Sequence, residues 1–120
     1  MATASAAHAD DFSRKVKKAK SIRGTKVIIV LIPCLPGWGV AENSGIKVTR
    51  LAVDAGVFPL YEVENGVKYT LNHTSKPTPI NTYLSAQKRY RHLSEQDIIT
   101  LQSAVDREWA RLQRRAQEAS

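Results

Sequence analysis

The sequence predicts an α/β fold that contains part of a doubly wound parallel sheet, a β-hairpin and C-terminal helices. Three observations predict it. A charged segment with helical spacing precedes a short, continuously apolar segment, a proline- and glycine-rich turn follows, and an Asn-Gly pair lies between two strand-like stretches further on. Continuous rather than alternating hydrophobicity is typical of a parallel strand that is buried on both faces. A helix followed by such a strand is half of a doubly wound unit.

Residues 10–20 have the pattern of an amphipathic helix. Phe12, Val16 and Ala19 recur at helical spacing and form one apolar stripe, while lysines occupy much of the remaining surface. Aspartates open the segment and lysines close it, which is the arrangement that the helix dipole favours. We expect this helix to stop at Gly24.

Residues 26–32 predict a strand that is apolar at every position after the first. We expect a central strand, with parallel neighbours on its edges and helices on both faces. The turn that follows leads to a second helix, which Asn43 or Ser44 can cap and Gly56 can close.

Residues 58–71 predict a β-hairpin around an Asn-Gly pair. A two-residue loop would place Val63 opposite Lys68, whereas a three-residue loop pairs Val63 with Val67 and Glu62 with Lys68. The second register sets apolar against apolar and opposite charges together. We therefore predict the three-residue loop, with the glycine at positive φ.

The C-terminal part is predicted to be helical. Residues 76–79 form a proline-containing extended connector, and a short helix over 80–90 follows, with Tyr83 and Leu84 facing inward. Ser94 caps the last helix, and acidic residues occupy its first turn. The apolar stripe of this last helix consists of Ile98, Leu101, Val105, Trp109 and Leu112, and the polar residues 114–120 are expected to fray.

Cys34 is the only cysteine, and it lies in the turn IPCLPGWG directly after the apolar strand. A thiol at the end of a buried strand, beside backbone that can approach a ligand closely, is typical of sites in α/β proteins. Four interpretations stay open from the residues alone: a cluster ligand, a catalytic nucleophile, a redox-sensing thiol, or a buried small hydrophobe, which is the favoured one. Trp38 in the same turn either lines a cofactor cavity or covers the strand ends.

We assign no catalytic acid or base. His8, His73 and His92 lack metal-ligand spacing and are expected to be surface or capping groups. Glu62 and Glu64 share one face of a strand but lie beside a lysine, which does not favour a paired-carboxylate site.

Three segments of the chain carry a family resemblance: IIVLIPCLPGWGV, RLAVDAGVFPLYEVENG and YLSAQKRYRHL. They resemble the C-terminal part of the β subunit of 2-oxoacid:ferredoxin oxidoreductases, thiamine-diphosphate enzymes that include pyruvate synthase and phenylglyoxylate dehydrogenase. The resemblance implies that residues 1–72 form the C-terminal part of a thiamine-diphosphate-binding α/β domain. Residues 73–120 would then be a connector and a helical extension. It also implies that Cys34 is one of four thiolate ligands to the [4Fe–4S] cluster nearest the thiamine.

The implied function belongs to the whole enzyme: oxidative decarboxylation of a 2-oxo acid to CO₂ and an acyl-CoA, with electrons passed to ferredoxin. The family's other three cluster cysteines and the Gly-Asp-Gly segment that binds magnesium and diphosphate are missing from this chain. We therefore expect a C-terminal piece that is inactive alone and does not itself bind thiamine diphosphate or Mg²⁺. Its partners would be the remaining oxidoreductase subunits, one of which carries the missing motifs, with coenzyme A and ferredoxin serving the complex.

The same resemblance implies that residues 1–6 form the end of a strand that precedes a helix within a longer subunit. The strands that would pair with residues 26–32 are then expected to be missing. An unpaired hydrophobic strand is a template for association. We therefore predict that the chain alone self-associates through residues 27–32.

A different class of function is a non-catalytic interaction module that kept this fold and lost the chemistry. The net charge of +7 lies mainly in the N-terminal third and at the C-terminal end, and we interpret it as solvated helix faces. No aromatic residues interleave with the basic cluster, which does not favour nucleic-acid binding. No apolar stretch approaches the ~18 residues that span a bilayer. A single cysteine agrees with a reducing compartment, so we expect a cytoplasmic chain.

Overall fold

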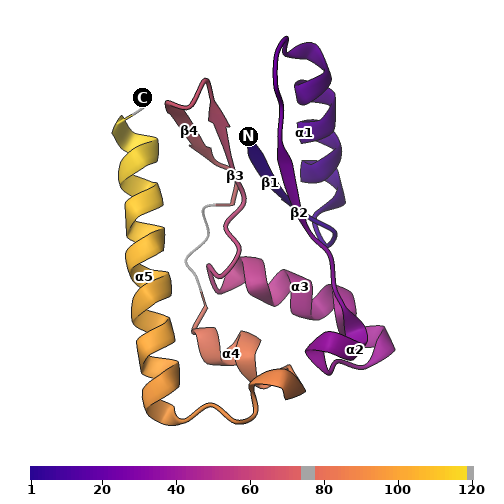
Figure 1. The fold of residues 1–120 in the computed structure, drawn as a ribbon, viewed down its shortest axis with the longest axis vertical. Helices are drawn as coiled ribbons and strands as arrows, with labels where there is room; N and C mark the ends of the chain where they lie inside the picture. The colour runs from indigo at the N-terminus through magenta and orange to yellow at the C-terminus, as the bar shows by residue number, and fades with distance from the viewer. Residues whose placement is uncertain (74–77, 119–120) are drawn as a thin grey trace.

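The computed structural model describes residues 1–73 and 78–118, and its centre is a four-stranded mixed sheet (Figure 1). The strand order is β2-β1-β3-β4, with β1 parallel to β2 and antiparallel to β3, and β3 antiparallel to β4. The strands are β1 Ala2–Ser5, β2 Ile28–Leu31, β3 Tyr61–Glu64 and β4 Lys68–Leu71. The predicted α/β class, with a partial parallel sheet, a hairpin and C-terminal helices, is confirmed.

Five α-helices surround this sheet in the described part of the chain. Helix α1 packs on β1, and the long α5 runs beside β4 near the opposite edge of the sheet (Figure 1). Helices α2, α3 and α4 gather at one end of the molecule, beyond the carboxyl ends of β1 and β2. The helices are α1 Ala9–Ser21, α2 Leu35–Trp38, α3 Gly45–Asp54, α4 Ile80–Ser85 and α5 Glu95–Glu118, with 3₁₀ turns at Glu42–Ser44 and Lys88–Tyr90.

Strand β2 is an edge strand, so the expectation of a central position was wrong. The segment before α1, expected to be only the end of a strand, is the inner strand β1, which pairs with β2 and β3. Only one edge of β2 therefore has a neighbour among the described residues. Val27, Ile29 and Ile32 are 51%, 50% and 66% exposed, so the apolar run is not buried on both faces either. Apolar residues predict that a surface can be buried, but they do not tell whether other residues of the same chain bury it.

Because one edge of β2 is open, self-association of the chain stays a prediction. Helix α5 lies along β4 and leaves this edge uncovered. We expect light scattering to show oligomers of the chain at tens of micromolar, and Ile29→Lys to shift them toward monomer because an edge charge opposes strand pairing. Wild-type chain that stays monomeric at these concentrations would contradict the prediction.

The face of α1 toward the sheet carries charges in addition to part of the predicted apolar stripe, of which Phe12 and Ala19 are half-buried. Lys15 is 2% exposed, and its Nζ donates to the carbonyl of Thr3 at 2.7 Å and to Asp11 at 2.6 Å. Val16, by contrast, is 39% exposed. Burial lowers the pKa of Lys15, against the opposing effect of Asp11. The lysines of this segment are therefore partly structural, and not only a solvated face.

Glu62 on β3 receives the other cations of α1. Its carboxylate accepts hydrogen bonds from Arg14 at 2.9 Å, Lys18 at 2.8 Å and Asn72 at 2.7 Å. Burial alone would raise the pKa of Glu62, but these three donors outweigh it and lower the pKa to about 2. Lys18 also pairs with Glu64. These contacts tie α1 to β3 across the inner strand.

The hairpin has a three-residue loop, as predicted, but the predicted register was wrong. Glu64 pairs with Lys68 and Glu62 with Thr70, so the loop begins one residue later than expected. The turn hydrogen bond runs from the amide of Val67 to the carbonyl of Glu64, and both Asn65 and Gly66 have positive φ, 53° and 73°. The Glu62–Lys68 pair assumed from the sequence does not form, because Glu62 serves the cations of α1.

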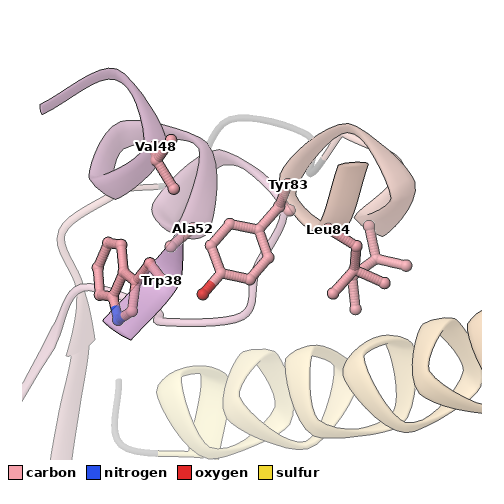
Figure 2. Close-up of a cluster of buried hydrophobic side chains, with 7 residues drawn as sticks. Trp38, Val48, Ala52, Tyr83 and Leu84 are labelled. Carbon is pink, nitrogen blue, oxygen red and sulfur yellow. The ribbon is translucent and has the colours of Figure 1, made fainter. Parts of the chain in front are cut away.

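The hydrophobic core lies among α2, α3 and α4 (Figure 2). Trp38 comes from α2, Val48 and Ala52 from α3, and Tyr83 and Leu84 from α4. The inward orientation predicted for Tyr83 and Leu84 is confirmed, since each is 5% exposed. Partly buried residues that pack against this core include Leu31 of β2 and Ile98 and Val105 of α5. One core therefore joins the ends of the sheet to the C-terminal helices.

The C-terminal helices follow the predicted order with different bounds. The expected helix over 80–90 ends at Ser85 and gives way to a 3₁₀ turn. Ser94 caps α5 as predicted: its Oγ accepts from the amide of Asp97 at 3.1 Å, and Asp97 accepts from the amide of Ser94 at 3.0 Å. Helix α5 continues through Glu118, beyond the point where fraying was expected.

Parts of two predictions lie outside the described residues: positions 76 and 77 of the connector, and the last two residues of the chain. The described part of the connector begins at Thr78, whose amide donates to the carbonyl of Asp54 at 2.8 Å. Within the ranges 1–73 and 78–118, no helix combines the length and apolar character needed to cross a membrane.

Candidate functional site at the Cys34 turn

The thiol of Cys34 is exposed at the start of a short helical turn. Cys34 is the N-cap residue of α2, with φ −116° and ψ 90°, and its carbonyl accepts a hydrogen bond from the amide of Trp38 at 2.8 Å. Pro36 inside this turn needs no amide partner there, which suits the first turn of a helix. The backbone that follows Cys34 therefore forms a hydrogen-bonded helical turn, while the side chain of Cys34 is exposed.

Two glycines allow the close approaches that shape this turn. A Cβ on Gly37 would lie 2.9 Å from Sγ of Cys34, so the glycine leaves space beside the sulfur. Gly39 has φ +66°, and a Cβ there would lie 2.6 Å from Cβ of Lys88. The amide of Lys88 donates to the carbonyl of Gly39 at 3.3 Å. The turn is thus packed directly against the segment that follows α4.

Trp38 anchors the turn to the core. It is 8% exposed and belongs to the cluster against which Leu31, the last residue of β2, packs. This position agrees with a side chain that covers the end of the strand, one of the two roles considered for it.

A polar group lies at the carboxyl end of β1, beside the end of β2. Ser5 is fully buried, and its Oγ lies 3.1 Å from Nδ1 of His8. The rings of His8 and His73 are 5.8 Å apart, and Nε2 of His73 lies 3.3 Å from Asp54. Burial, followed by the charges of His73 and Arg50, lowers the pKa of His8. His8 and His73 are thus half-buried and close together, and His8 is also the N-cap residue of α1, as one of the two expected roles has it, without a side-chain capping hydrogen bond.

The parallel pairing of β1 and β2 brings these two features to one end of the sheet. Ser5 pairs with Leu31, and the amide of Ala6 donates to the carbonyl of Leu31 at 3.1 Å. The carboxyl ends of parallel strands are where open α/β sheets bind ligands. The Cys34 turn and the Ser5–His8 group therefore both lie at the carboxyl ends of the parallel strands β1 and β2.

Similarity to curated relatives decides the family. The chain is 49% identical over 106 residues to pyruvate synthase subunit PorB of Methanocaldococcus jannaschii, covering 88% of this chain and 36% of the relative. It is 43% identical over 119 residues to ketoisovalerate oxidoreductase subunit VorB of Pyrococcus furiosus, covering 97% and 38%. This chain belongs to the β subunits of 2-oxoacid:ferredoxin oxidoreductases. PorB of Thermotoga maritima is 36% identical over 116 residues, covering 92% of this chain and 36% of the relative.

The chain is thus a segment of a 2-oxoacid:ferredoxin oxidoreductase β subunit that spans less than two fifths of the length of these relatives. No family model matches it. The resemblance seen in the sequence is confirmed. The roles of individual residues are not decided by similarity alone.

The chemistry of Cys34 fits a single metal-bound thiolate. Its sulfur is exposed and lies against Gly37, where a Cβ would be only 2.9 Å from it. In the described part of the chain, no group of three or more His, Cys, Asp or Glu side chains is placed to hold a metal ion.

The structure excludes one of the other interpretations of Cys34. The buried small hydrophobe is excluded, because the residue is exposed. As a nucleophile Cys34 would need a base; the ring of His8 contacts Ser5, and Nε2 of His73 lies 3.3 Å from Oδ1 of Asp54. Glu62 and Glu64 are held by the cations of α1, in line with the view that they form no acid/base pair.

Sequence reasoning missed two features of this end of the molecule. The Ser5–His8–His73–Asp54 group joins positions that only the fold brings together. Arg89, which stacks on Trp38, was also not singled out. The family motif YLSAQKRYRHL contains Arg89 and was the one available signal.

Proposed function

We propose that this chain forms the part of a 2-oxoacid:ferredoxin oxidoreductase β subunit that supplies Cys34 as one of four thiolate ligands to a [4Fe–4S] cluster. The observation that carries the proposal is the exposed thiol at the carboxyl end of the parallel strands, with space left beside its sulfur by Gly37. Similarity to PorB and VorB across 88% and 97% of the chain supports the same assignment.

The whole enzyme would convert a 2-oxo acid and coenzyme A to an acyl-CoA and CO₂, with one proton released to solvent and two electrons transferred to ferredoxin. A [4Fe–4S] cluster, when bound, supplies one-electron transfer, and its potential depends on nearby charges, hydrogen bonds and solvent exposure. Cys34 would be the residue of this chain that holds the cluster, and Trp38 would fix the turn that carries Cys34 to the core. Thiamine diphosphate and Mg²⁺ would be bound by a polypeptide that carries Gly-Asp-Gly and the other cysteines.

The substrate class follows from the relatives in outline only. One relative is named for pyruvate and another for ketoisovalerate, and both names describe 2-oxo acids. We therefore propose a 2-oxo acid of this kind as the substrate of the assembled enzyme, and a cytoplasmic site of action.

Reconstitution tests this function. The chain would be co-expressed with a polypeptide that carries the missing motifs, and reduction of ferredoxin or a viologen dye would be followed with pyruvate or ketoisovalerate and coenzyme A. We expect the two polypeptides to co-purify and to reduce the acceptor only together and only with a 2-oxo acid. A matched omission of coenzyme A serves as the control.

One outcome would favour a different function. A stable complex that contains no iron and reduces no acceptor with any 2-oxo acid would contradict the enzyme assignment. It would support the alternative, a non-catalytic interaction module derived from this fold.

A further inference from the structure

The guanidinium of Arg89 is held between two aromatic rings. Its central carbon lies 4.9 Å from the centre of the Trp38 ring and 4.5 Å from that of the Tyr90 ring. Arginine stacks well on aromatic faces because its charge is delocalised over a plane and only weakly hydrated. This contact joins the Cys34 turn to the 3₁₀ turn Lys88–Tyr90, which is distant in the sequence.

Hydrogen bonds fix the edges of the same guanidinium. Nε of Arg89 donates to Oε1 of Gln87 at 2.8 Å, and Nη2 donates to the hydroxyl of Tyr83 at 3.1 Å. Gln87 is 2% exposed, and its Nε2 donates to the carbonyl of Tyr83 at 2.9 Å. Arg89 thus lies over two aromatic rings and donates to two neutral acceptors, one on Tyr83 of α4 and one on Gln87, whose side chain is held by the carbonyl of Tyr83.

No carboxylate pairs with Arg89 among residues 1–73 and 78–118. An arginine that served only as a surface ion pair would have such a partner. Instead, the planar guanidinium of Arg89 lies over the ring of Trp38, which comes one helical turn after Cys34.

We infer that Arg89 is a positioning residue for the Cys34 turn. Its contacts hold Trp38 against α4 and Tyr90. The helical turn α2 therefore stays formed after Cys34, and the sulfur of Cys34 stays beside Gly37. The close contact of Gly39 with Lys88 holds the far end of the turn in the same way. The part of this inference that concerns the cluster rests on the proposed function and deepens it. The geometric part concerns this chain alone.

The single cysteine gives a direct readout of this role. The full chain would be alkylated with iodoacetamide, a neutral reagent, well below its unfolding temperature, so that the rate reports how the exposed sulfur is held against Gly37. We expect Arg89→Gln to raise the rate about threefold, because a loosened turn frees the sulfur from this contact and loss of the cation–π contact favours the loosened turn. Arg89→Lys keeps the charge over the rings and is expected to give an intermediate rate.

Arg91→Gln is the matched control, because Arg91 is exposed, lies just after the same 3₁₀ turn and carries the same charge. It is expected to leave the alkylation rate unchanged. Equal rates for wild type and Arg89→Gln would overturn the inference, and so would an equal increase in Arg89→Gln and Arg91→Gln. Circular dichroism checks the fold of each variant. If Arg89→Gln does not fold, a wild-type alkylation rate in Arg89→Lys overturns the inference instead.

A second readout uses the assembled complex. The electron paramagnetic resonance spectrum of the reduced cluster is expected to change in Arg89→Gln and to be restored toward wild type in Arg89→Lys. A wild-type complex without a cluster signal would contradict the proposed function, whereas an unchanged alkylation rate would contradict the role of Arg89. The two failures are therefore distinguishable.

Discussion

Replacing Trp38 with alanine is expected to lower the free energy of unfolding by about 3–5 kcal/mol, the range for large aromatic side chains removed from a core. Trp38 is 8% exposed and packs with Val48 and Ala52 of α3 and Tyr83 of α4 (Figure 2). Its loss would leave a cavity between the Cys34 turn and α4 and would remove the stacking partner of Arg89.

Urea unfolding followed by far-ultraviolet circular dichroism measures this effect. Trp109→Ala is the matched control, since Trp109 is only half-buried on α5, and we expect a loss of about 1–2 kcal/mol there. Trp38→Phe keeps a ring in place and is expected to cost less than Trp38→Ala. If Trp38→Ala destabilises the chain no more than Trp109→Ala, the turn is not anchored in the way described.

The second large effect is expected at Glu62. Glu62→Gln removes the negative charge that receives Arg14 and Lys18, and the free energy of unfolding at neutral pH should fall by about 2–3 kcal/mol. The side chain of Glu62 is only 7% exposed, whereas those of Arg14 and Lys18 are 49% and 39% exposed, so water screens part of the loss. Glu64→Gln, at a much more open position of the same strand, is the control and should have a smaller effect.

The same carboxylate predicts how stability depends on pH. In the folded chain the pKa of Glu62 is lowered from 4.5 to about 2. Below 4.5 the unfolded chain takes up the proton first, so the stabilisation by Glu62 is complete above this pH and is lost as the pH falls toward 2. Wild-type stability should therefore decline over this window more steeply than that of Glu62→Gln. Parallel declines in acid unfolding curves would contradict the assignment.

The sequence predicted features whose signals are local. The cap formed by Ser94, the inward side chains of α4 and the turn at Cys34 each depend on a few neighbouring residues, and the structure contains all three. The family resemblance also rested on contiguous motifs, and similarity to PorB and VorB confirmed it.

Features that depend on partners distant in the sequence could not be predicted in the same way. The register of the hairpin was wrong because Glu62 bonds α1, so that its cross-strand neighbour did not decide the pairing. Lys15 is buried because the carbonyl of Thr3 and Asp11 satisfy its ammonium, which no helical periodicity reveals. Likewise, the contacts of Arg89 with Trp38 and of His8 with His73 exist only once the chain is folded.

The measurement that tests the central claim most directly is the iron content of the assembled complex, together with its electron paramagnetic resonance spectrum after reduction. The variant is Cys34→Ala, and Ser44→Ala, which alters a hydroxyl just before α3, is the control. We predict that Cys34→Ala loses about four iron atoms per chain and the signal of one [4Fe–4S] cluster, because the cluster lacks its fourth thiolate. A Cys34→Ala complex that keeps its full iron content, cluster signal and activity would contradict the claim that Cys34 is a cluster ligand.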